Sequence, residues 1–352
     1  MNGQSVQGRE PMSRTGANGA GRSGRSSLRG WGGVSAMVAV CLLALAAVVV
    51  PLLCGSVPDE VGRGALLQTG SGLAHARQAA ADDSCTNPAA SLRPSDATGP
   101  AVQRIKNRGY LIVGVDQNSY LWGYRDPGSG QIIGFDIDLV RAIASNILNT
   151  STPKIVFKTV PTNQRIPAIQ SHEVDMVVRT MTINCDRIKQ VAFSTAYFEA
   201  GQQLLVPRIG TTITGFDDSL TGKRVCTAAG STGEVQLQRE PHGSRIVLAA
   251  NQLDCLVLLQ LGQVDAVLTD NALAAGQAAQ DPQVHLIGEP LTHEPYGVAM
   301  NLADTDLVRR VNMVLQQYTK GGVNSQWMQA YNKWLAHNLP GVSGPPTPLY
   351  KD

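Results

Sequence analysis

Two stretches of the sequence carry residues suited to binding a negatively charged group. In the first, Arg187 follows Thr180 and Thr182, whose alternation places both hydroxyls on one face of an extended segment. An arginine can donate two parallel hydrogen bonds to a carboxylate. In the second, the loop 230–233 opens a helical pattern, and free N–H groups at the start of a helix also suit an anion. These residue types favour recognition of a carboxylate.

Other reactive motifs are missing from the sequence. It contains neither a G-x-x-x-x-G-K-[ST] phosphate loop nor a G-x-S-x-G elbow. No C-x-x-C pair occurs and the six histidines are scattered, so we predict no zinc or other metal site and no cofactor. An acid/base enzyme without a recognisable motif stays possible.

The charge is unevenly spread along the 352 residues, whose formal net charge is +2. Residues 1–33 hold five arginines against one acid, so the rest of the chain is slightly acidic. The chain after residue 33 therefore lacks the excess of positive charge that sequence-independent nucleic-acid binding needs, and we expect no nucleic-acid partner.

Residues 101–338 alternate short apolar runs with helical patterns. The strand predictions are residues 110–115, 154–160, 174–179, 203–206, 224–227, 245–248, 266–268, 285–287 and 297–301. Helices are predicted over 136–148, with Asp136 as N-cap, and over 304–319 and 324–335. This alternation predicts an α/β protein with mostly parallel sheets covered on both faces. The length allows two lobes, each with its own core.

A short repeat suggests that the two lobes are similar to each other. Val174-Asp175 is echoed by Val264-Asp265, and each pair follows a helical pattern. Each pair could also simply mark the place where the chain passes from solvent into a buried strand, without any similarity between the lobes.

The beginning of the chain predicts export and membrane tethering. The basic residues 1–33 precede the apolar run 34–54, which is long enough to span a bilayer and, by the positive-inside rule, leaves the body outside. Two alternatives stay open: lipidation at Cys54, which follows a bulky Leu53, or an uncleaved single span. Either one places the protein at the extracytoplasmic face of the cell membrane. Residues 55–100 are predicted to be a flexible tether, and residues 339–352 a tail outside the core.

Four cysteines lie beyond the anchor segment, which in an exported chain favours disulfides. Cys226 lies in a predicted strand and Cys255 in the helix after the next strand, so a Cys226–Cys255 bond would staple one lobe. Cys85 would then pair with Cys185. Four cysteines permit three arrangements, and sequence alone does not decide among them.

An ordered set of segments carries a family resemblance across residues 104–335. They are G-Y-L-I-V-G-V-D at 109–116, G-F-D-I-D at 134–138, N-Q-R-I-P-A-I at 163–169, R-T-M-T-I-N-C-D-R at 179–187, F-S-T-A-Y at 193–197, L-T-G-K-R-V at 220–225, G-S-T-G at 230–233, V-D-A at 264–266 with Asp270, and P-Y-G at 295–297. This set resembles the extracellular solute-binding proteins, family 3, of polar amino-acid ABC importers, including glutamate/aspartate- and glutamine-binding lipoproteins.

The resemblance implies a two-lobed periplasmic-binding-protein-like fold of type II. In that fold the chain crosses twice between the lobes, which close over one amino acid in the cleft. By the resemblance, the first lobe comprises residues 101–200 and 294–338, and the second comprises residues 201–293. A monomer is expected.

The resemblance also implies roles for the polar residues. Arg187 would bind the α-carboxylate with Thr180 and Thr182, and Asp270 would bind the α-ammonium. The remaining implied contacts come from Ser231 and Thr232, at the start of a helix, and from Asp116, which matches a pocket-lining position. The aromatic residue that often follows this aspartate is replaced, so Tyr120 or Trp122 is the candidate for the wall of the site.

Simpler explanations exist for several of these residues. Asp270 could cap a helix, Asp116 could be a solvated strand end, and Arg187 could be a surface residue. Thr180 and Thr182 could be there only because threonine favours strands.

Arg165 points to the ligand's side chain. The segment 164–167 is similar to an N-R-I-P segment that binds the side-chain carboxylate in glutamate/aspartate-binding members, and Ala228 replaces a lysine of the glutamine-binding ones. Arg179 is the rival second cation, and Arg165 could instead be a solvated residue. The resemblance therefore implies a non-enzymatic receptor for glutamate or aspartate that serves an ABC importer permease. Its alternatives are a ligand-sensing partner of a membrane signalling protein and, less favoured, a dehydratase of small carboxylates on the same fold.

Overall fold

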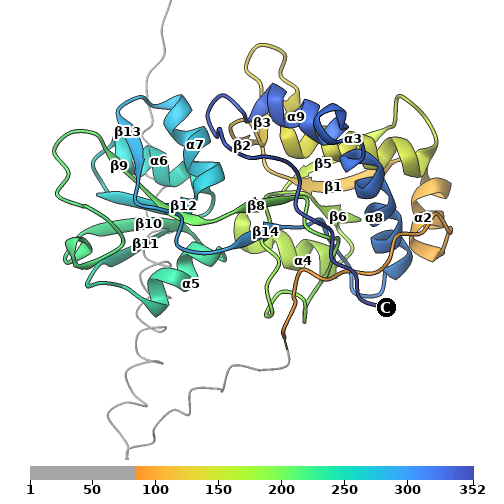
Figure 1. The fold of residues 1–352 in the computed structure, drawn as a ribbon, viewed down its shortest axis with the longest axis horizontal. Helices are drawn as coiled ribbons and strands as arrows, with labels where there is room; N and C mark the ends of the chain where they lie inside the picture. The colour runs from red at the N-terminus through yellow and green to blue at the C-terminus, as the bar shows by residue number, and fades with distance from the viewer. Residues whose placement is uncertain (1–84) are drawn as a thin grey trace, which may run out of the picture. The chain divides into compact units, whose positions relative to one another are not determined.

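The computed structural model describes residues 85–352. The predictions for the basic start, the apolar run 34–54 and lipidation at Cys54 lie outside these residues. In the described part of the chain, two five-stranded sheets stand side by side, each with helices around it (Figure 1). No helix among the described residues is long and apolar enough to cross a membrane.

The first sheet has the strand order β5-β1-β6-β15-β7. Its strands are β1 (Leu111–Val115), β5 (Ile155–Thr159), β6 (Met176–Val177), β7 (Ala192–Phe193) and β15 (Ala299–Met300). β1 is parallel to β5 and β6, whereas β15 is antiparallel to β6 and β7. The helices on one face are α2 (Pro100–Arg108), α3 (Phe135–Leu148), α8 (Thr305–Thr319) and α9 (Gln326–Trp334). The other face packs against α4 (Arg165–Gln170).

The second sheet has the strand order β11-β10-β12-β9-β13. Its strands are β9 (Gln202–Pro207), β10 (Arg224–Ala228), β11 (Arg245–Ala249), β12 (Ala266–Asp270) and β13 (Val284–Ile287). Successive side chains point to opposite faces, so Leu205 packs with α6 (Gln252–Gln260) and α7 (Asn271–Gln280). Its neighbour Leu204 packs on the side of α5 (Thr232–Arg239). The parts of the chain built on the two sheets are called the first and second lobes below.

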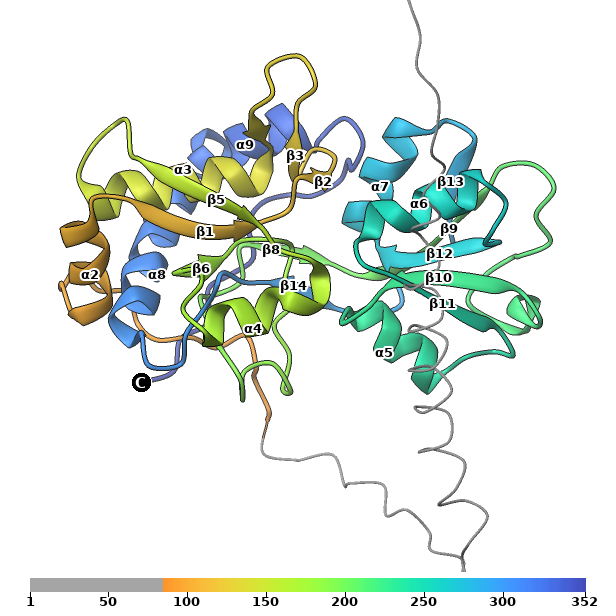
Figure 2. The ribbon, with the colours of Figure 1, turned by 180° about the vertical axis from the view of Figure 1, so that it is seen from behind.

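Two short strands connect the lobes. β8 (Phe198–Ala200) pairs antiparallel with β14 (Glu294–Tyr296), and in Figure 2 the two run between the lobes. β8 leads into β9 of the second sheet, and β14 leads back to β15 of the first. Every strand of the second sheet lies within the predicted range 201–293, and the lobe boundaries themselves stay a prediction.

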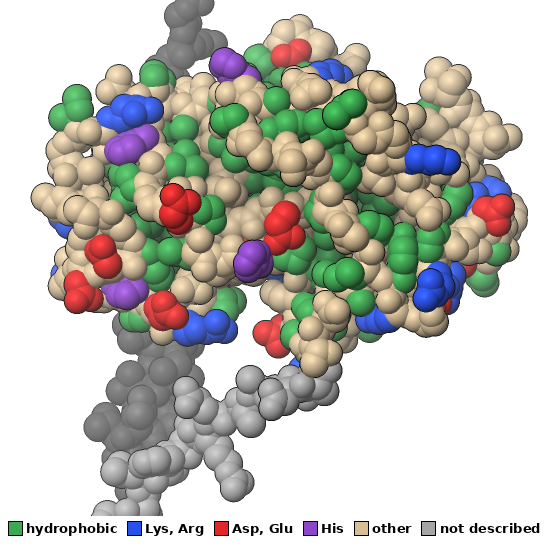
Figure 3. All heavy atoms as spheres, viewed as in Figure 1, with side chains coloured by type: hydrophobic (Ala, Val, Ile, Leu, Met, Phe, Trp, Pro, Cys, Tyr) green, Lys and Arg blue, Asp and Glu red, His purple; other side chains and the backbone are tan. Residues whose placement is uncertain are grey.

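The remaining elements are short. A three-stranded sheet is formed by β2 (Asn118–Ser119), β3 (Gly123–Arg125) and β4 (Ile132–Ile133). The 3-10 helices are η1 (Thr162–Gln164), η2 (Asp218–Leu220) and η3 (Gly322–Asn324). On the face drawn in Figure 3, side chains of both charges are interspersed.

The repeated Val-Asp pairs occupy matching places in the two lobes. Asp175 precedes β6 and accepts a hydrogen bond from the backbone N–H of Ile112 in β1, at 2.8 Å. Asp265 precedes β12 and accepts one from the N–H of Arg224 in β10, at 2.7 Å. Each aspartate therefore ties the start of one inner strand to its parallel neighbour, which explains why both lobes carry the pair.

The predicted strands all overlap observed ones, but the sheets are mixed rather than mostly parallel. Helix α3 begins after Gly134, and Asp136 is not its N-cap, contrary to our prediction. The reason is that the buried Asp136 carboxylate is bonded elsewhere. It accepts from the hydroxyl of Tyr197 at 2.9 Å and from the backbone N–H of Thr180 at 3.1 Å.

Both ends of the described chain pack against the first lobe, although we predicted a flexible tether up to residue 100 and a tail outside the core. Ser91 is buried and forms a bridge with Tyr350. Asn312 in α8, fully buried, donates to the Ser91 hydroxyl at 2.8 Å and to the carbonyl of Leu92 at 2.6 Å. A buried amide needs such partners, and segments distant in sequence supply them.

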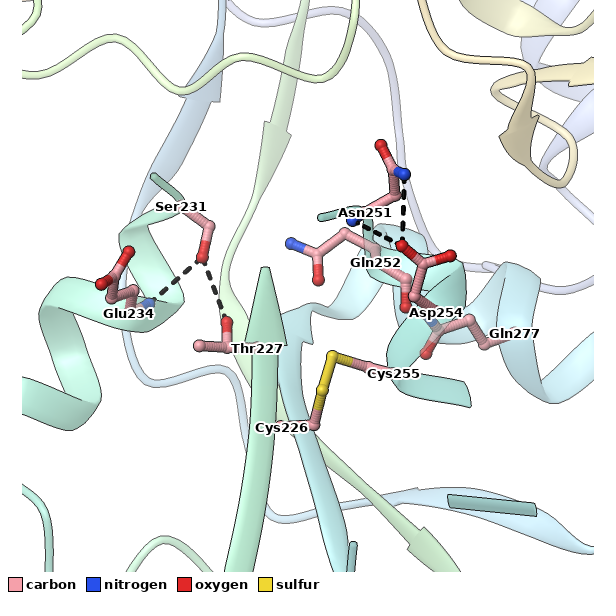
Figure 4. The surroundings of a disulfide bond; sticks show 9 residues. All are labelled: Cys226, Thr227, Ser231, Glu234, Asn251, Gln252, Asp254, Cys255 and Gln277. Atoms are coloured by element: carbon pink, nitrogen blue, oxygen red, sulfur yellow. Dashed lines mark hydrogen bonds between the residues drawn. A yellow bond between two sulfur atoms is a disulfide. The ribbon is translucent and has the colours of Figure 1, made fainter. Parts of the chain in front are cut away.

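The structure contains both disulfides in the pairing that we favoured, Cys85–Cys185 and Cys226–Cys255. The second joins β10 to α6 in the core of the second lobe (Figure 4). The first joins the segment before α2 to the loop between β6 and β7.

Candidate functional site

A polar cavity lies between the two lobes, and its free volume in this structure is only about 10 Å³. The residues that line it are Ser119, Thr162, Arg165, Arg179, Thr180, Thr182 and Arg187 from the first lobe, and Ser231, Thr232, Gln252, Asp270 and Leu273 from the second. All the predicted ligand-binding residues except Asp116 are among them. Segments up to about 150 residues apart in sequence, from Ser119 to Leu273, thus converge, because the end of β12, the start of α5 and the β6–β7 loop lie at the same cleft.

Two buried arginines face this cavity. Arg187 donates to the carbonyl of Thr182 at 2.8 Å and to that of Gly230 at 3.1 Å. Arg165 donates to the carbonyls of Thr162 at 2.9 Å, Arg179 at 3.4 Å and Gly230 at 3.4 Å. Burial lowers the pKa of both guanidiniums, and that of Arg165 falls further beside Arg187. Guanidiniums stay protonated in proteins, so both charges persist. Their hydrogen-bond acceptors among the described residues are neutral carbonyls, while the carboxylate of Asp270 attracts both cations without a described hydrogen bond.

Arg179 is the third buried arginine that lines the cavity, and it has a carboxylate partner. Its guanidinium lies 2.8 Å from Asp116, with both side chains almost fully buried, and also donates to the side chains of Thr162 and Asn251. Asp116 accepts further bonds from the hydroxyl of Ser119 and from the backbone N–H of Gln117. The structure therefore places Asp116 behind the cavity wall, where its carboxylate neutralises Arg179, the alternative to Arg165 as a second cation for the ligand.

Thr180 is held in an unusual backbone conformation. Its φ is +42°, which is uncommon for a β-branched residue. The bond from its N–H to Asp136 fixes this conformation from inside the first lobe. Burial raises the pKa of Asp136 to about 7, against the effect of the Tyr197 hydrogen bond. Thr182 lies two residues further on and forms a bridge with Tyr296 of the connecting strand β14.

The start of α5 forms the floor of the cavity in the second lobe. Ser231 is the N-cap of this helix and accepts from the N–H of Glu234 at 3.1 Å, and its hydroxyl also bonds Thr227 (Figure 4). Thr232 donates instead to the carboxylate of Glu294 at 2.9 Å. The helix therefore points its N–H groups at the cleft, the arrangement that favours an anion.

Asp270 is aimed into the cavity rather than capping a helix. It precedes α7, but its side chain makes no capping bond. Its carboxylate accepts from the hydroxyl of Tyr296 at 2.5 Å and from the amide of Gln202. Burial and the neighbouring Glu294 raise its pKa to about 7. A cation that binds here would favour the ionised carboxylate.

Three residues at the site were not singled out in the sequence. Gln202, the first residue of β9, donates to Asp270 and Thr232, and Glu294, in the connecting strand β14, accepts from Thr232. Gln252 lines the cavity from the start of α6 (Figure 4), and its side-chain oxygen is buried without a partner among the described residues. Glu294 directly precedes the P-Y-G segment at 295–297, and this motif could have drawn attention to it. No sequence pattern marks Gln202 or Gln252.

The expected aromatic wall is not part of this cavity. Trp122 is buried in the core of the first lobe and donates to the carbonyl of Ala272 at 3.1 Å. Tyr120 packs edge-on against Tyr124, outside the lining residues. Within the described residues, no group of histidine, cysteine and acidic side chains could hold a metal ion.

The comparison with known families matches residues 111–337 to the model of bacterial extracellular solute-binding proteins, family 3. This chain belongs to that family. Its family relatives include an ABC transporter glutamine-binding protein of Bacillus subtilis, 36% identical over 66% of this chain and 83% of the relative. A glutamate/aspartate import solute-binding protein of Salmonella typhimurium is 28% identical over 69% of this chain and 82% of its own length.

Solved structures of the family have the same two-lobed fold. One is an ancestral arginine-binding protein bound to glutamine, with a TM-score of 0.60 and 36% identity. It matches 65% of this chain and 98% of its own length. The type II two-lobed fold implied by the motifs is thus confirmed. The two sequence relatives are named as amino-acid-binding proteins of transport systems.

Proposed function

We propose that this protein is an extracytoplasmic receptor that binds glutamate or aspartate and delivers it to an ABC importer. The observation that carries this proposal is the pair of buried guanidiniums, Arg165 and Arg187, whose described acceptors are all backbone carbonyls. An acidic amino acid brings two carboxylates, one for each cation.

The ammonium of such a ligand also has a matching group. Asp270 lies on the opposite lobe from Arg165 and Arg187 and faces the same cavity. In this arrangement Arg187, Thr182 and the start of α5 bind the α-carboxylate, Asp270 binds the ammonium, and Arg165 binds the side-chain carboxylate. Arg179 does not take part, because Asp116 already neutralises it.

Calorimetry with a panel of amino acids tests the specificity. We expect aspartate and glutamate to bind well below millimolar and glutamine at least tenfold more weakly, because an amide cannot neutralise Arg165. A basic amino acid as the tightest ligand would contradict the acidic specificity, and no binding of any amino acid would contradict the receptor function.

Glutamine is the second candidate ligand. It is favoured by the unpartnered side-chain oxygen of Gln252, which could accept from a ligand amide, and by the relatives named as glutamine-binding. The same calorimetry separates the candidates, since a tighter fit for glutamine than for glutamate would decide in its favour.

The proposal includes a monomer tethered to the outer face of the membrane. A membrane-impermeant amine reagent should label the exposed Lys320 on intact cells. Labelling only after lysis would contradict this location. Co-purification with a membrane signalling protein instead of a permease would favour the sensing alternative.

A further inference from the structure

The loop that carries Arg187 is covalently joined to the first residue that the structure describes. Cys185, which forms a disulfide with Cys85, lies two residues before Arg187 in the loop between β6 and β7. The two cysteines are 100 residues apart in sequence. The disulfide therefore links the site to a segment that lies outside both sheets.

This loop is attached to the rest of the lobe on both sides of its turn. Before the turn, the N–H of Ile183 donates to the carbonyl of Pro295 at 2.7 Å, and after it the amide of Gln170 donates to the carbonyl of Gln190 at 3.3 Å.

The backbone hydrogen bonds of the turn itself are local. The backbone N–H of Arg187 donates to the side chain of Asn184 at 2.9 Å, and the N–H of Val191 donates to the carbonyl of Arg187 at 2.9 Å. Asp186 and Gln190 are exposed, whereas the Arg187 side chain is buried in the cleft. Between these attachments, the partly exposed turn at Cys185 and Asp186 can still shift locally unless something outside it fixes its position.

The other side of the disulfide is firmly held. Ser91, six residues after Cys85, donates to the carbonyl of Phe193 at 2.6 Å. The fully buried Asn312 holds the same serine and also accepts from the N–H of Thr195 at 2.8 Å. Residues 85–92, called the strap below, thus run from the core helix α8 to the Arg187 loop.

We propose that the Cys85–Cys185 disulfide positions the Arg187 guanidinium for the ligand's carboxylate, so that the strap is a working part of the binding site. The inference rests on the proposed function, because it takes Arg187 as the group that binds the carboxylate. A guanidinium on an unfixed loop would have to be ordered when the ligand binds, and that ordering lowers affinity.

The test compares ligand affinity with and without the disulfide. In the Cys85→Ala/Cys185→Ala variant, calorimetry with L-glutamate should show about tenfold weaker binding, the size expected for coupled groups in one site. If wild type prefers L-glutamine, the same measurement is made with that amino acid, since both share the α-carboxylate. A preference of the wild type for L-glutamine would contradict the acidic specificity. The role of the strap would still be tested, by the loss of L-glutamine affinity in the variant.

A double-mutant cycle separates positioning from general loosening. In an Arg187→Lys background, removal of the disulfide should cost little further affinity, because the group that it positions is already changed. The control is the Cys226→Ala/Cys255→Ala variant, whose effect should add to that of Arg187→Lys. Additive effects for the Cys85–Cys185 pair, or unchanged affinity without it, would overturn the inference.

A second measurement needs no ligand. Without the disulfide, amide hydrogen exchange at Arg187 and Val191 should become faster, while exchange in β10 and β12 stays the same. Unchanged exchange in the loop would overturn the inference even if no amino acid bound, and in that case the proposed function would fail separately.

Discussion

Arg187 donates a hydrogen bond to the carbonyl oxygen of Gly230 across the cleft, at 3.1 Å. Arg165 donates to the same oxygen at 3.4 Å. Two cations of the first lobe thus meet one backbone atom of the second, at the start of α5. Because a carboxylate is a stronger acceptor than a carbonyl, a ligand that reaches both guanidiniums would replace this contact and keep the lobes together.

Gly230→Ala should impair closure of the lobes. Gly230 has a φ of +77°, and a Cβ atom here would lie 2.8 Å from the Cα of Asn163 in the first lobe. We expect a loss of ligand affinity of at least about fivefold, because the clash with Asn163 opposes the approach of the two lobes. The cost of an alanine at a positive φ, about 1 kcal/mol, lowers stability but is shared by the open and closed states. Small-angle scattering with saturating glutamate should show a larger radius for the variant. Gly262→Ala, at a positive φ with open space around it, is the control.

Arg187→Ala and Asp270→Ala should each abolish measurable binding. Both side chains are buried at the cavity, and removal of one member of a buried charged pair commonly costs about 2–5 kcal/mol. Calorimetry reports the binding, and circular dichroism checks that the variants fold. Asp265→Ala, in the same lobe but away from the cavity, should bind normally. Near-normal affinity of either cavity variant would refute its role.

Arg165→Leu should change selectivity more than it changes folding. Affinity for glutamate and aspartate should fall far more than affinity for glutamine, because only the acids need a second cation. Arg179→Leu should behave differently, since it leaves the buried Asp116 without its partner. We expect that variant to lose about 3–5 kcal/mol of stability. Equal losses for acids and amides in Arg165→Leu would contradict the assignment.

Ligand affinity should rise with pH up to about 7. The pKa of Asp270 is raised to about 7, mainly by burial and by Glu294, so much of this carboxylate is protonated below that pH. A ligand ammonium favours the ionised form, and binding should release a proton. Besides Glu294, the groups that face Asp270 are Tyr296, Gln202, Arg187 and Arg165.

The stability of the protein without ligand should show the opposite trend. A carboxyl with a raised pKa in the folded state binds more protons there than in the unfolded state. Its contribution to stability is therefore lost as the pH rises from about 4 to about 7. The free energy of unfolding, measured with urea at several pH values, should depend less on pH in Asp270→Asn. The remaining dependence should be due to Asp136, whose pKa is also raised to about 7. Ligand affinity that does not vary between about pH 5 and 8 would contradict the predicted role of Asp270 in binding.

Mass spectrometry of the exported protein should find both disulfides oxidised. Reduction should add four hydrogens, two for each disulfide that is reduced to a pair of thiols. The free energy of unfolding of the Cys226→Ala/Cys255→Ala variant should be about 2–4 kcal/mol lower. The variant loses a cross-link between β10 and α6 at a place where both cysteines are fully buried. Free thiols at these two positions in the exported protein would disprove the pairing.

Two kinds of pattern in the sequence were informative. Apolar periodicity indicated the α/β class, because it specifies which face of an element is buried. The resemblance of the ordered motifs indicated the family, the two-lobed fold and most of the cavity lining. The motif around Thr180, Thr182 and Arg187 places its residues on one strand end and the loop after it. No partner from elsewhere in the chain is needed to recognise them.

The use of the charges, by contrast, depends on contacts between segments that are distant in sequence. Asp116 and Arg179 are 63 residues apart, and their ion pair leaves Arg165 as the second cation of the cavity. Glu294 acquires its role because β14 passes beside Thr232 of the other lobe. The strap, which has the composition of a linker, is ordered because Asn312 and Cys185 hold its two ends. A charge or a buried amide is satisfied by whichever groups the fold brings near it, and those neighbours are distant in sequence.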